Sequence, residues 1–148
     1  MKTMQKMKFN VKAQSEGVTV KAQAGKHEVV LDESAQMGGK DLGPNPLQNI
    51  LVSLASCENV TGHIVAREMK FDLQGLSFNV TGEFDPRGFM GDPEVCPYFE
   101  TVTVEATVTT SESEERIKEL KEKVEARCPV YTMLKGANVE MIDNWTKA

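Results

Sequence analysis

Two cysteines carry the strongest candidate chemistry in this chain. Cys57 ends the apolar run over residues 46–57, and Cys128 follows a charged stretch over residues 114–127. A thiolate is a nucleophile that reacts near neutral pH without an elaborate relay. If the fold brings the two sulfurs together, the chain can run a dithiol–disulfide cycle. The competing interpretation is that both cysteines only fill space in the core, because free cysteine is among the most buried residue types.

Reduction of a peroxide is one reaction that suits such a pair. A cysteine thiolate attacks a peroxide oxygen and becomes a sulfenic acid, which a second thiol converts to a disulfide. Hydrogen-bond donors or positive charge must lower the pKa of the attacking thiol. An organic peroxide also requires an apolar pocket, so both thiols must lie on inward faces of their elements.

The element that positions Cys57 is a long helix, which we expect to run from Pro46 to about Lys70. Asn45 followed by Pro46 is typical of an N-cap with proline at the first helical position. Residues of one face recur every three or four positions and predict the buried stripe: Ile50, Leu54, Cys57, Thr61 and Ile64. Further apolar residues predict that this helix is nearly surrounded by protein.

A second amphipathic helix is expected over residues 111–127. Ile117, Leu120 and Val124 form its buried stripe, and Cys128 continues that stripe four residues after Val124. Pro129 breaks or restarts the helix, and residues 130–135 predict a short further helix.

Strand patterns surround these helices. Residues 8–32 predict two or three short antiparallel strands, and residues 73–84, 98–109 and 138–144 predict one strand each. The Gly- and Pro-containing stretch over residues 85–97 predicts a long connection. The order indicates one domain over residues 1–148, an α+β fold with two main helices against antiparallel sheet.

Composition excludes several classes of function. The net charge of −5 and the lack of a dense basic stripe argue against a nucleic-acid partner. No segment is apolar enough to span a membrane, and the basic N-terminus lacks the apolar run of a signal peptide. We therefore expect a cytoplasmic protein whose three cysteines are reduced. The two histidines lie far apart in sequence, so we expect neither a metal site nor a cofactor.

Motifs around both cysteines resemble the OsmC/Ohr family (osmotically inducible protein C-like and organic hydroperoxide resistance proteins). They are Gly-Pro-Asn-Pro at 43–46, Ala-Ser-Cys at 55–57 and Arg-Cys-Pro-Val at 127–130. Residues 37–40 and 85–89 extend the resemblance, which covers the chain from about residue 31 to its end. The resemblance implies an intertwined homodimer with active sites at the subunit interface.

By the same resemblance, Cys57 is the peroxidatic thiol and Cys128 the resolving thiol. The implied activity is that of a thiol-dependent peroxidase in the oxidative stress response, which reduces an organic hydroperoxide to its alcohol. A dithiol reductant then reopens the disulfide. No cofactor or metal enters this cycle.

Two departures from the family pattern keep another function open. Leu47 stands where the family's peroxidases carry a glutamate that holds an arginine against the thiol, and the first arginine of this chain is Arg67. These departures place the chain nearer the OsmC-like branch than the well-defined hydroperoxide reductases. The alternative is a weakly or non-catalytic dimer that binds a small apolar ligand at the same interface. A third possibility is a structural interaction protein with inert buried cysteines.

Four further residues are secondary candidates. We interpret Cys96 as an incidental thiol in a loop, and His63 as a structural histidine rather than a base. Glu58, directly after Cys57, is expected to face solvent or to form an interfacial salt bridge. Arg87 is expected to shape its loop or an interface.

Overall fold

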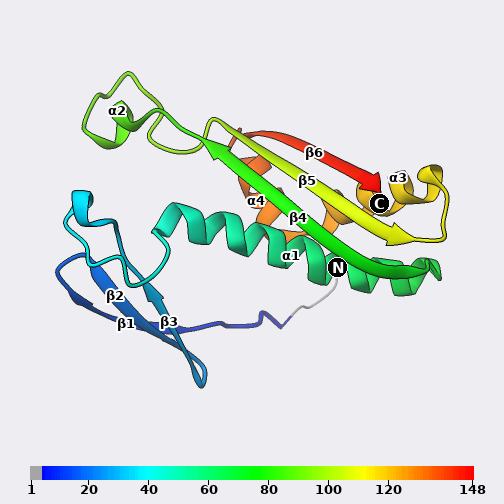
Figure 1. The fold of residues 1–148 in the computed structure, drawn as a ribbon, viewed down its shortest axis with the longest axis horizontal. Coiled ribbons are helices and arrows are strands. Elements are labelled where there is room, and N and C mark those ends of the chain that lie inside the picture. The colour runs from blue at the N-terminus through cyan, green and yellow to red at the C-terminus, as the bar shows by residue number, and fades with distance from the viewer. Residues whose placement is uncertain (1–4) are drawn as a thin grey trace. The chain divides into compact units, whose positions relative to one another are not determined.

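The structure is a computed structural model that describes residues 5–148 and divides into two units. The first ends at Ile50 and the second is Leu51–Ala148. Figure 1 traces both units along the chain. Among the described residues, no helix is both long and apolar enough to cross a bilayer.

The first unit contains a three-stranded antiparallel sheet. Its strands are β1 (Val11–Glu16), β2 (Thr19–Ala24) and β3 (His27–Leu31), in the order β1-β2-β3. The two-residue turns between them contain Gly17 and Gly25, each with a φ of +63°, a conformation that glycine adopts without strain. The prediction of two or three short antiparallel strands is confirmed.

A loop with one turn of 3₁₀ helix, η1 (Ala35–Met37), leads from β3 to the first long helix. The Gly-Pro-Asn-Pro motif lies where this loop returns to the sheet. The Asp32 N–H donates to the Pro44 carbonyl at 3.0 Å. A Cβ on Gly43 would collide with the Val30 carbonyl, so the close approach requires glycine.

The long helix α1 (Pro46–Met69) begins with a reciprocal pair of capping hydrogen bonds. The Asn45 side chain accepts from the Gln48 N–H at 2.7 Å, and the Gln48 side chain accepts from the Asn45 N–H at 3.0 Å. Two of the orphan N–H groups at the start of the helix are thereby satisfied. The predicted N-cap at Asn45 is confirmed, with Pro46 as the first helical residue.

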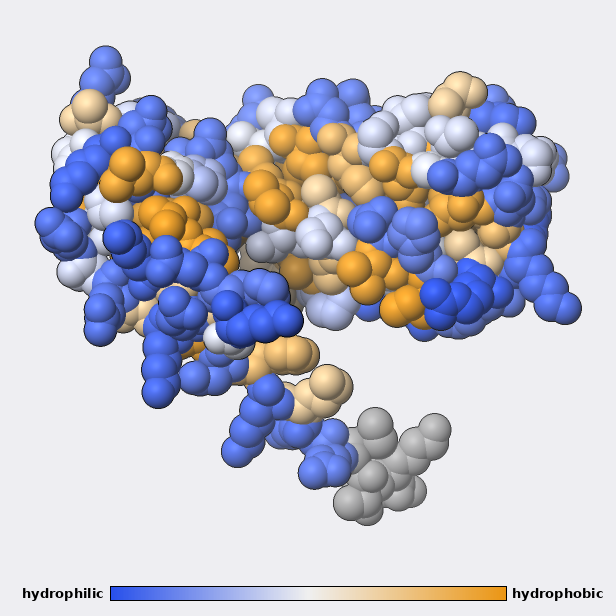
Figure 2. Space-filling model, turned by 60° about the horizontal axis from the view of Figure 1, so that its bottom comes forward, coloured by the Kyte–Doolittle hydropathy of each residue, from blue (hydrophilic) through white to orange (hydrophobic). Residues whose placement is uncertain are grey.

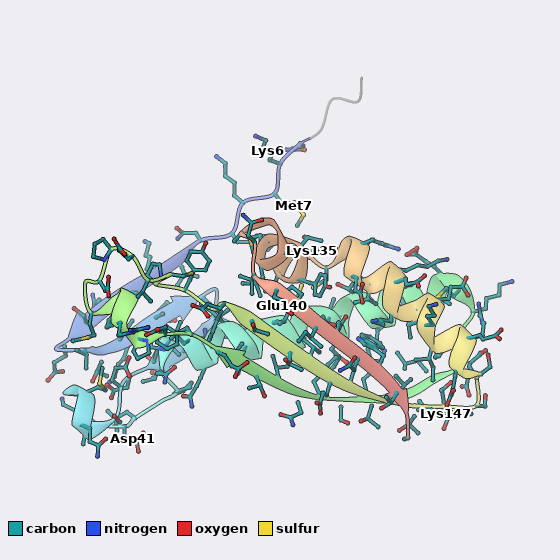
Figure 3. The ribbon with its side chains drawn as sticks, turned by 90° about the horizontal axis from the view of Figure 1, so that it is seen from above. Lys6, Met7, Asp41, Lys135, Glu140 and Lys147 are labelled. Atoms are coloured by element: carbon teal, nitrogen blue, oxygen red, sulfur yellow. The ribbon has the colours of Figure 1, made fainter. Side chains whose placement is uncertain are left out.

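The second unit contains the other sheet, in the order β4 (Leu73–Glu83), β5 (Thr101–Thr110) and β6 (Glu140–Lys147). Figure 3 labels the two ends of β6. The short helix α2 (Pro86–Phe89) lies in the connection between β4 and β5. β4 and β5 are antiparallel, but β5 and β6 are parallel, which corrects the expectation of purely antiparallel sheet. The cause is the connection: two helices join β5 to β6, and such a crossover returns the chain in the same direction.

Helices α3 (Glu114–Arg127) and α4 (Pro129–Gly136) form this connection. The predicted stripe of α3 is buried, as are Cys128 and the alternate residues of β5 that were expected to face the core. These core residues are Ile117, Leu120, Val124, Val102, Val104, Ala106 and Val108. Pro129 starts α4 rather than only ending α3.

The buried face of α1 differs from the predicted stripe. It consists of Leu54, Glu58, Thr61, Gly62, Val65 and Ala66. Ile50 and Ile64, expected inside, are 39% and 43% exposed. The spacing of apolar residues pointed to the wrong centre because a polar residue, Glu58, occupies the buried face. The expectation that α1 is nearly surrounded by protein is wrong for this single chain.

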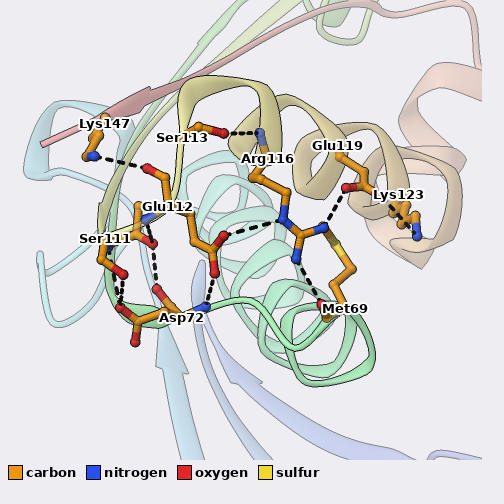
Figure 4. A network of polar contacts seen from close by, with 10 residues as sticks. Met69, Asp72, Ser111, Glu112, Ser113, Arg116, Glu119, Lys123 and Lys147 are labelled. Carbon is orange, nitrogen blue, oxygen red and sulfur yellow. Dashed lines mark hydrogen bonds and ion pairs between the residues drawn. The ribbon is translucent and has the colours of Figure 1, made fainter.

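A polar network fixes the end of α1 against the start of α3 (Figure 4). The Arg116 guanidinium donates to the Met69 carbonyl at 2.9 Å and pairs with Glu112 and Glu119. Asp72, just after α1, accepts from the Ser111 hydroxyl at 2.6 Å. The helix that carries Cys57 is thus held to the helix that leads to Cys128.

Candidate active site

Cys57 and Cys128 both lie in the Leu51–Ala148 unit and both carry free thiols. Cys57 is half-buried on α1, whereas Cys128 is fully buried between α3 and α4. The nearby Cys57 side chain contributes to the raised pKa of Cys128. The structure therefore brings the two sulfurs within interaction range of each other.

The Cys128 thiol is strongly held in its protonated form. Burial raises the pKa of Cys128 to about 12, with smaller contributions from the nearby Cys57 and Glu58, while a hydrogen bond with the Tyr131 backbone acts to lower it. At neutral pH the group is a thiol and needs a proton acceptor before it can act as a nucleophile.

Cys128 is also fixed by its backbone. Its N–H donates to the Val124 carbonyl at 2.8 Å, which ends α3. Its carbonyl accepts from the N–H and the hydroxyl of Thr132, at 2.9 and 2.8 Å, within α4. Pro129 occupies the first position of α4, where a missing N–H costs nothing. The Arg-Cys-Pro-Val motif therefore holds the sulfur at a rigid junction of two helices.

Glu58 and Asp143 are site residues that the sequence interpretation missed. Glu58 is 0% exposed and Asp143 is 6% exposed, so the expectation that Glu58 faces solvent or an interfacial salt bridge is wrong. Both Glu58 oxygens and Oδ2 of Asp143 have no hydrogen-bond partner among residues 5–148. Asp143 Oδ1 accepts from Trp145 Nε1 at 3.1 Å. Glu58 lies four residues after the buried Leu54, and that spacing was the signal that could have located it.

Both carboxyl groups resist ionisation. Burial, followed by the charge of Asp143, raises the pKa of Glu58 to about 8. Burial, followed by the charge of Glu125, raises the pKa of Asp143 to about 7. A pair of buried carboxyl groups beside a dithiol is a means of holding and moving protons.

The other secondary candidates lie apart from this chemistry. Cys96 donates a weak hydrogen bond to the Tyr98 carbonyl at 3.5 Å in the β4–β5 connection. His63 is exposed on α1. The Arg87 Nε donates to Asp85 at 3.0 Å, a contact that shapes its loop. Within the described part of the chain, no cluster of three or more histidine, cysteine or acidic residues is arranged for a metal ion.

An exposed apolar surface runs along α1 beside Cys57. Val52, Val60 and Ile64 are 58%, 55% and 43% exposed. Val60 and Ile64 lie three and seven positions after Cys57, so they share its side of the helix. In Figure 2, which brings the lower side of Figure 1 forward, hydrophobic side chains are exposed on the molecular surface.

Comparison with known proteins places this fold in a family. The family model described as OsmC-like protein matches residues 38–142. A protein named hydroperoxide reductase from Mycoplasma pneumoniae is 28% identical over 127 residues, which are 84% of each chain.

Solved structures agree with the observed fold. The crystal structure of an OsmC-like protein from Mycoplasma pneumoniae has a TM-score of 0.84 at 25% identity and covers 97% of this chain and 99% of its own. The structure of an organic hydroperoxide resistance protein OsmC from Legionella pneumophila has a TM-score of 0.70 at 19% identity, and the match covers 96% of this chain and 97% of that one. At this identity the likeness supports only the fold. The match over most of the chain, together with this α+β architecture, shows that the protein belongs to the OsmC-like family.

Proposed function

We propose that the protein is a thiol-dependent peroxidase that reduces organic hydroperoxides through Cys57 and Cys128. The observation that carries the proposal is the proximity of two free thiols, one half-buried and one fully buried. The relative from Mycoplasma pneumoniae named hydroperoxide reductase supports the same reaction class.

The first step consumes the hydroperoxide. The Cys57 thiolate attacks the outer peroxide oxygen, the O–O bond breaks, and the alkoxide takes a proton to leave as the alcohol. Cys57 becomes a sulfenic acid. The half-buried position of Cys57 allows a substrate to reach its sulfur, which the buried Cys128 does not offer.

The second step closes the disulfide. The Cys128 sulfur attacks the Cys57 sulfenic acid, the S–O bond breaks, and the oxygen leaves as water. A small dithiol then reduces the Cys57–Cys128 disulfide by exchange. Two thiols and one hydroperoxide thus give one disulfide, one alcohol and one water.

We further propose that the active unit is a homodimer formed through the exposed apolar face of α1. Isolated apolar side chains on a surface are normal, but a set that follows one helix face is typical of an interface. Val60 and Ile64, three and seven residues after Cys57, form such a set on the Cys57 side of α1. A partner that covers it would enclose the half-buried thiol in apolar surroundings suited to an organic peroxide.

The second candidate function is binding of a small apolar ligand with little or no turnover. It is favoured by Leu47, which stands where the family's peroxidases carry a glutamate, and by the use of Gln48 in the helix cap instead. A small molecule that copurifies with the protein, together with no turnover, would support this function.

Turnover measurements with cumene hydroperoxide and excess dithiol separate the two functions. We expect consumption of hydroperoxide by the native chain, loss of at least 10³-fold in Cys57→Ser, and accumulation of Cys57 sulfenic acid in Cys128→Ser. Cys96→Ser is the matched control and retains full turnover. No turnover with any dithiol would contradict the peroxidase function.

A further inference from the structure

Glu58 and Asp143 form an unusual arrangement for two acidic side chains. An ionised carboxylate only accepts hydrogen bonds, so two ionised carboxylates cannot bond to each other. With a single proton between them, one becomes a donor and the other accepts. Three of their four oxygens have no hydrogen-bond partner among residues 5–148. One shared proton lets one carboxyl group donate to the other, and it removes one of the two buried charges.

The groups around the pair come from β6 itself and from two further elements, α3 and α4. On β6, Trp145 donates to Asp143 at 3.1 Å. On α3, Glu125 adds negative charge that favours the protonated form of both acids, while Lys121 opposes it at Asp143. Lys121 itself is paired with Glu125 at 3.4 Å.

On α4, Tyr131 is buried near the same charges. The pKa of Tyr131 is raised to about 12 by burial and then by Glu125, Asp143 and Glu58. It therefore stays neutral and adds no further negative charge beside the pair. The surroundings retain a proton on the pair at neutral pH.

Glu58 links the acid pair to the two cysteines, because it lies on α1 beside Cys57. Glu58 directly follows Cys57 in the chain, and the Glu58 charge contributes to the raised pKa of Cys128. Glu58 and Cys128 are both 0% exposed, so the Glu58 charge acts on the Cys128 thiol within the buried interior.

Building on the proposed function, we propose that Glu58 and Asp143 share one proton and that Glu58 accepts the proton of Cys128 when this thiol attacks Cys57. In the peroxidase cycle the S–S bond forms as the S–O bond of the sulfenic acid breaks. The Cys128 proton passes to Glu58, and the pair releases one proton to the departing hydroxide, which leaves as water. The pair holds one proton before and after the step, so atoms and charge balance.

Attack by Cys128 can be measured without any hydroperoxide. In a Cys96→Ser background, 4,4′-dithiodipyridine reacts with the half-buried Cys57 and releases one thiopyridone. Cys128 then attacks the mixed disulfide and releases a second. The second release reports proton loss from Cys128 alone, so a protein without peroxidase turnover still gives a clear result.

We expect Glu58→Gln to slow the second release by about 10²-fold at pH 7, since general-base catalysis contributes 10²- to 10⁴-fold. Glu122→Gln, the same change on the exposed face of α3, is the control and leaves the rate unchanged. If Glu58 acted only through its charge, its removal would favour the Cys128 thiolate and speed the release. An equal or faster rate in Glu58→Gln therefore overturns the proposal.

A second variant covers the case in which Glu58→Gln does not fold. Asp143→Asn removes the negative neighbour of Glu58, so Glu58 ionises at a lower pH. The rate of second release, plotted against pH, then rises at lower pH than in the parent protein. An unshifted profile overturns the assignment of Glu58 as acceptor.

Trp145 reports the shared proton independently of any thiol reaction. It is the single tryptophan of the chain and donates to Asp143. We expect its fluorescence in the reduced protein to titrate between about pH 7 and 8, with values that belong to the pair rather than to either acid. His63→Gln is the control for histidine titration and retains the transition. Absence of the transition in the native chain, or its persistence in Asp143→Asn, overturns the shared proton.

Discussion

Cys128 combines full burial with a fixed backbone, and this combination defines how it can react. The pKa of about 12 leaves roughly one thiolate in 10⁴ at pH 8. Such a thiol is protected from adventitious oxidants and reacts when a partner sulfur is presented to it. Cys57, half-buried and beside an exposed apolar surface, is the thiol that solvent molecules can reach.

This difference predicts an order of alkylation. With iodoacetamide at pH 8, we expect modification of Cys57 and Cys96 at least tenfold faster than modification of Cys128, as read by peptide mass mapping. In urea, where burial is lost, the three rates converge. Equal alkylation rates for the three cysteines in the folded protein would show that Cys128 is accessible to the reagent. That result would contradict the prediction that burial protects Cys128.

The buried carboxyl pair predicts how stability depends on pH. The pKa of Glu58 rises from its ordinary value of 4.5 to about 8, so the folded state binds more protons than the unfolded chain between these values. Stability is therefore fully present below about pH 4.5 and is lost as pH rises toward 8. We expect the free energy of unfolding to fall by a few kcal/mol over this range.

Urea denaturation at several pH values measures this decline in the free energy of unfolding. Glu58→Gln flattens the decline, while the surface variant Glu122→Gln keeps it. Stability that increases steadily from pH 5 to 8 would contradict the raised pKa values.

At the scale of elements, local patterns identified the segments but not all of their faces. The alternation of β5 and the apolar stripe of α3 predict the buried faces correctly, because each faces one side of a single core. The apolar spacing of α1 predicts the wrong face, because this helix carries a polar residue inside and apolar residues outside. Hydropathy assigns each residue one preference, whereas Glu58 is buried beside Asp143 and Val60 is exposed. The direction of β6 also required the three-dimensional arrangement, since strand patterns do not encode pairing direction.

The contact between α1 and α3 predicts the effect of Arg116→Ala. This change removes the hydrogen bond to the Met69 carbonyl and two partly exposed ion pairs. We expect a loss of about 1–2 kcal/mol in the free energy of unfolding, measured by urea titration. Lys118→Ala removes an exposed side chain from the same helix and is expected to cost less than about 0.5 kcal/mol. Equal costs would mean that the network does not hold the two helices.

At the scale of the whole molecule, the exposed face of α1 predicts self-association. Val60→Glu places a charge on this face, and we expect it to convert a dimer to a monomer in sedimentation velocity. Glu122→Lys changes charge on the exposed side of α3 and keeps the dimer. A monomeric native protein at micromolar concentration would contradict an interface on α1.

The family resemblance and the two thiols could be identified from the sequence because motifs at both cysteines are local. The pair of Glu58 and Asp143 could not be identified from the sequence, because the two residues lie on α1 and β6, far apart in the chain. Only tertiary packing brings two carboxyl groups together, and no local pattern marks such a pair.

Intact-mass analysis after one equivalent of cumene hydroperoxide tests the dithiol mechanism most directly. The account predicts a loss of two hydrogen masses from the reduced protein, with peptide mapping that locates one bridge between Cys57 and Cys128. An unchanged mass, or oxygen added to Cys57 with Cys128 still a free thiol, would contradict it.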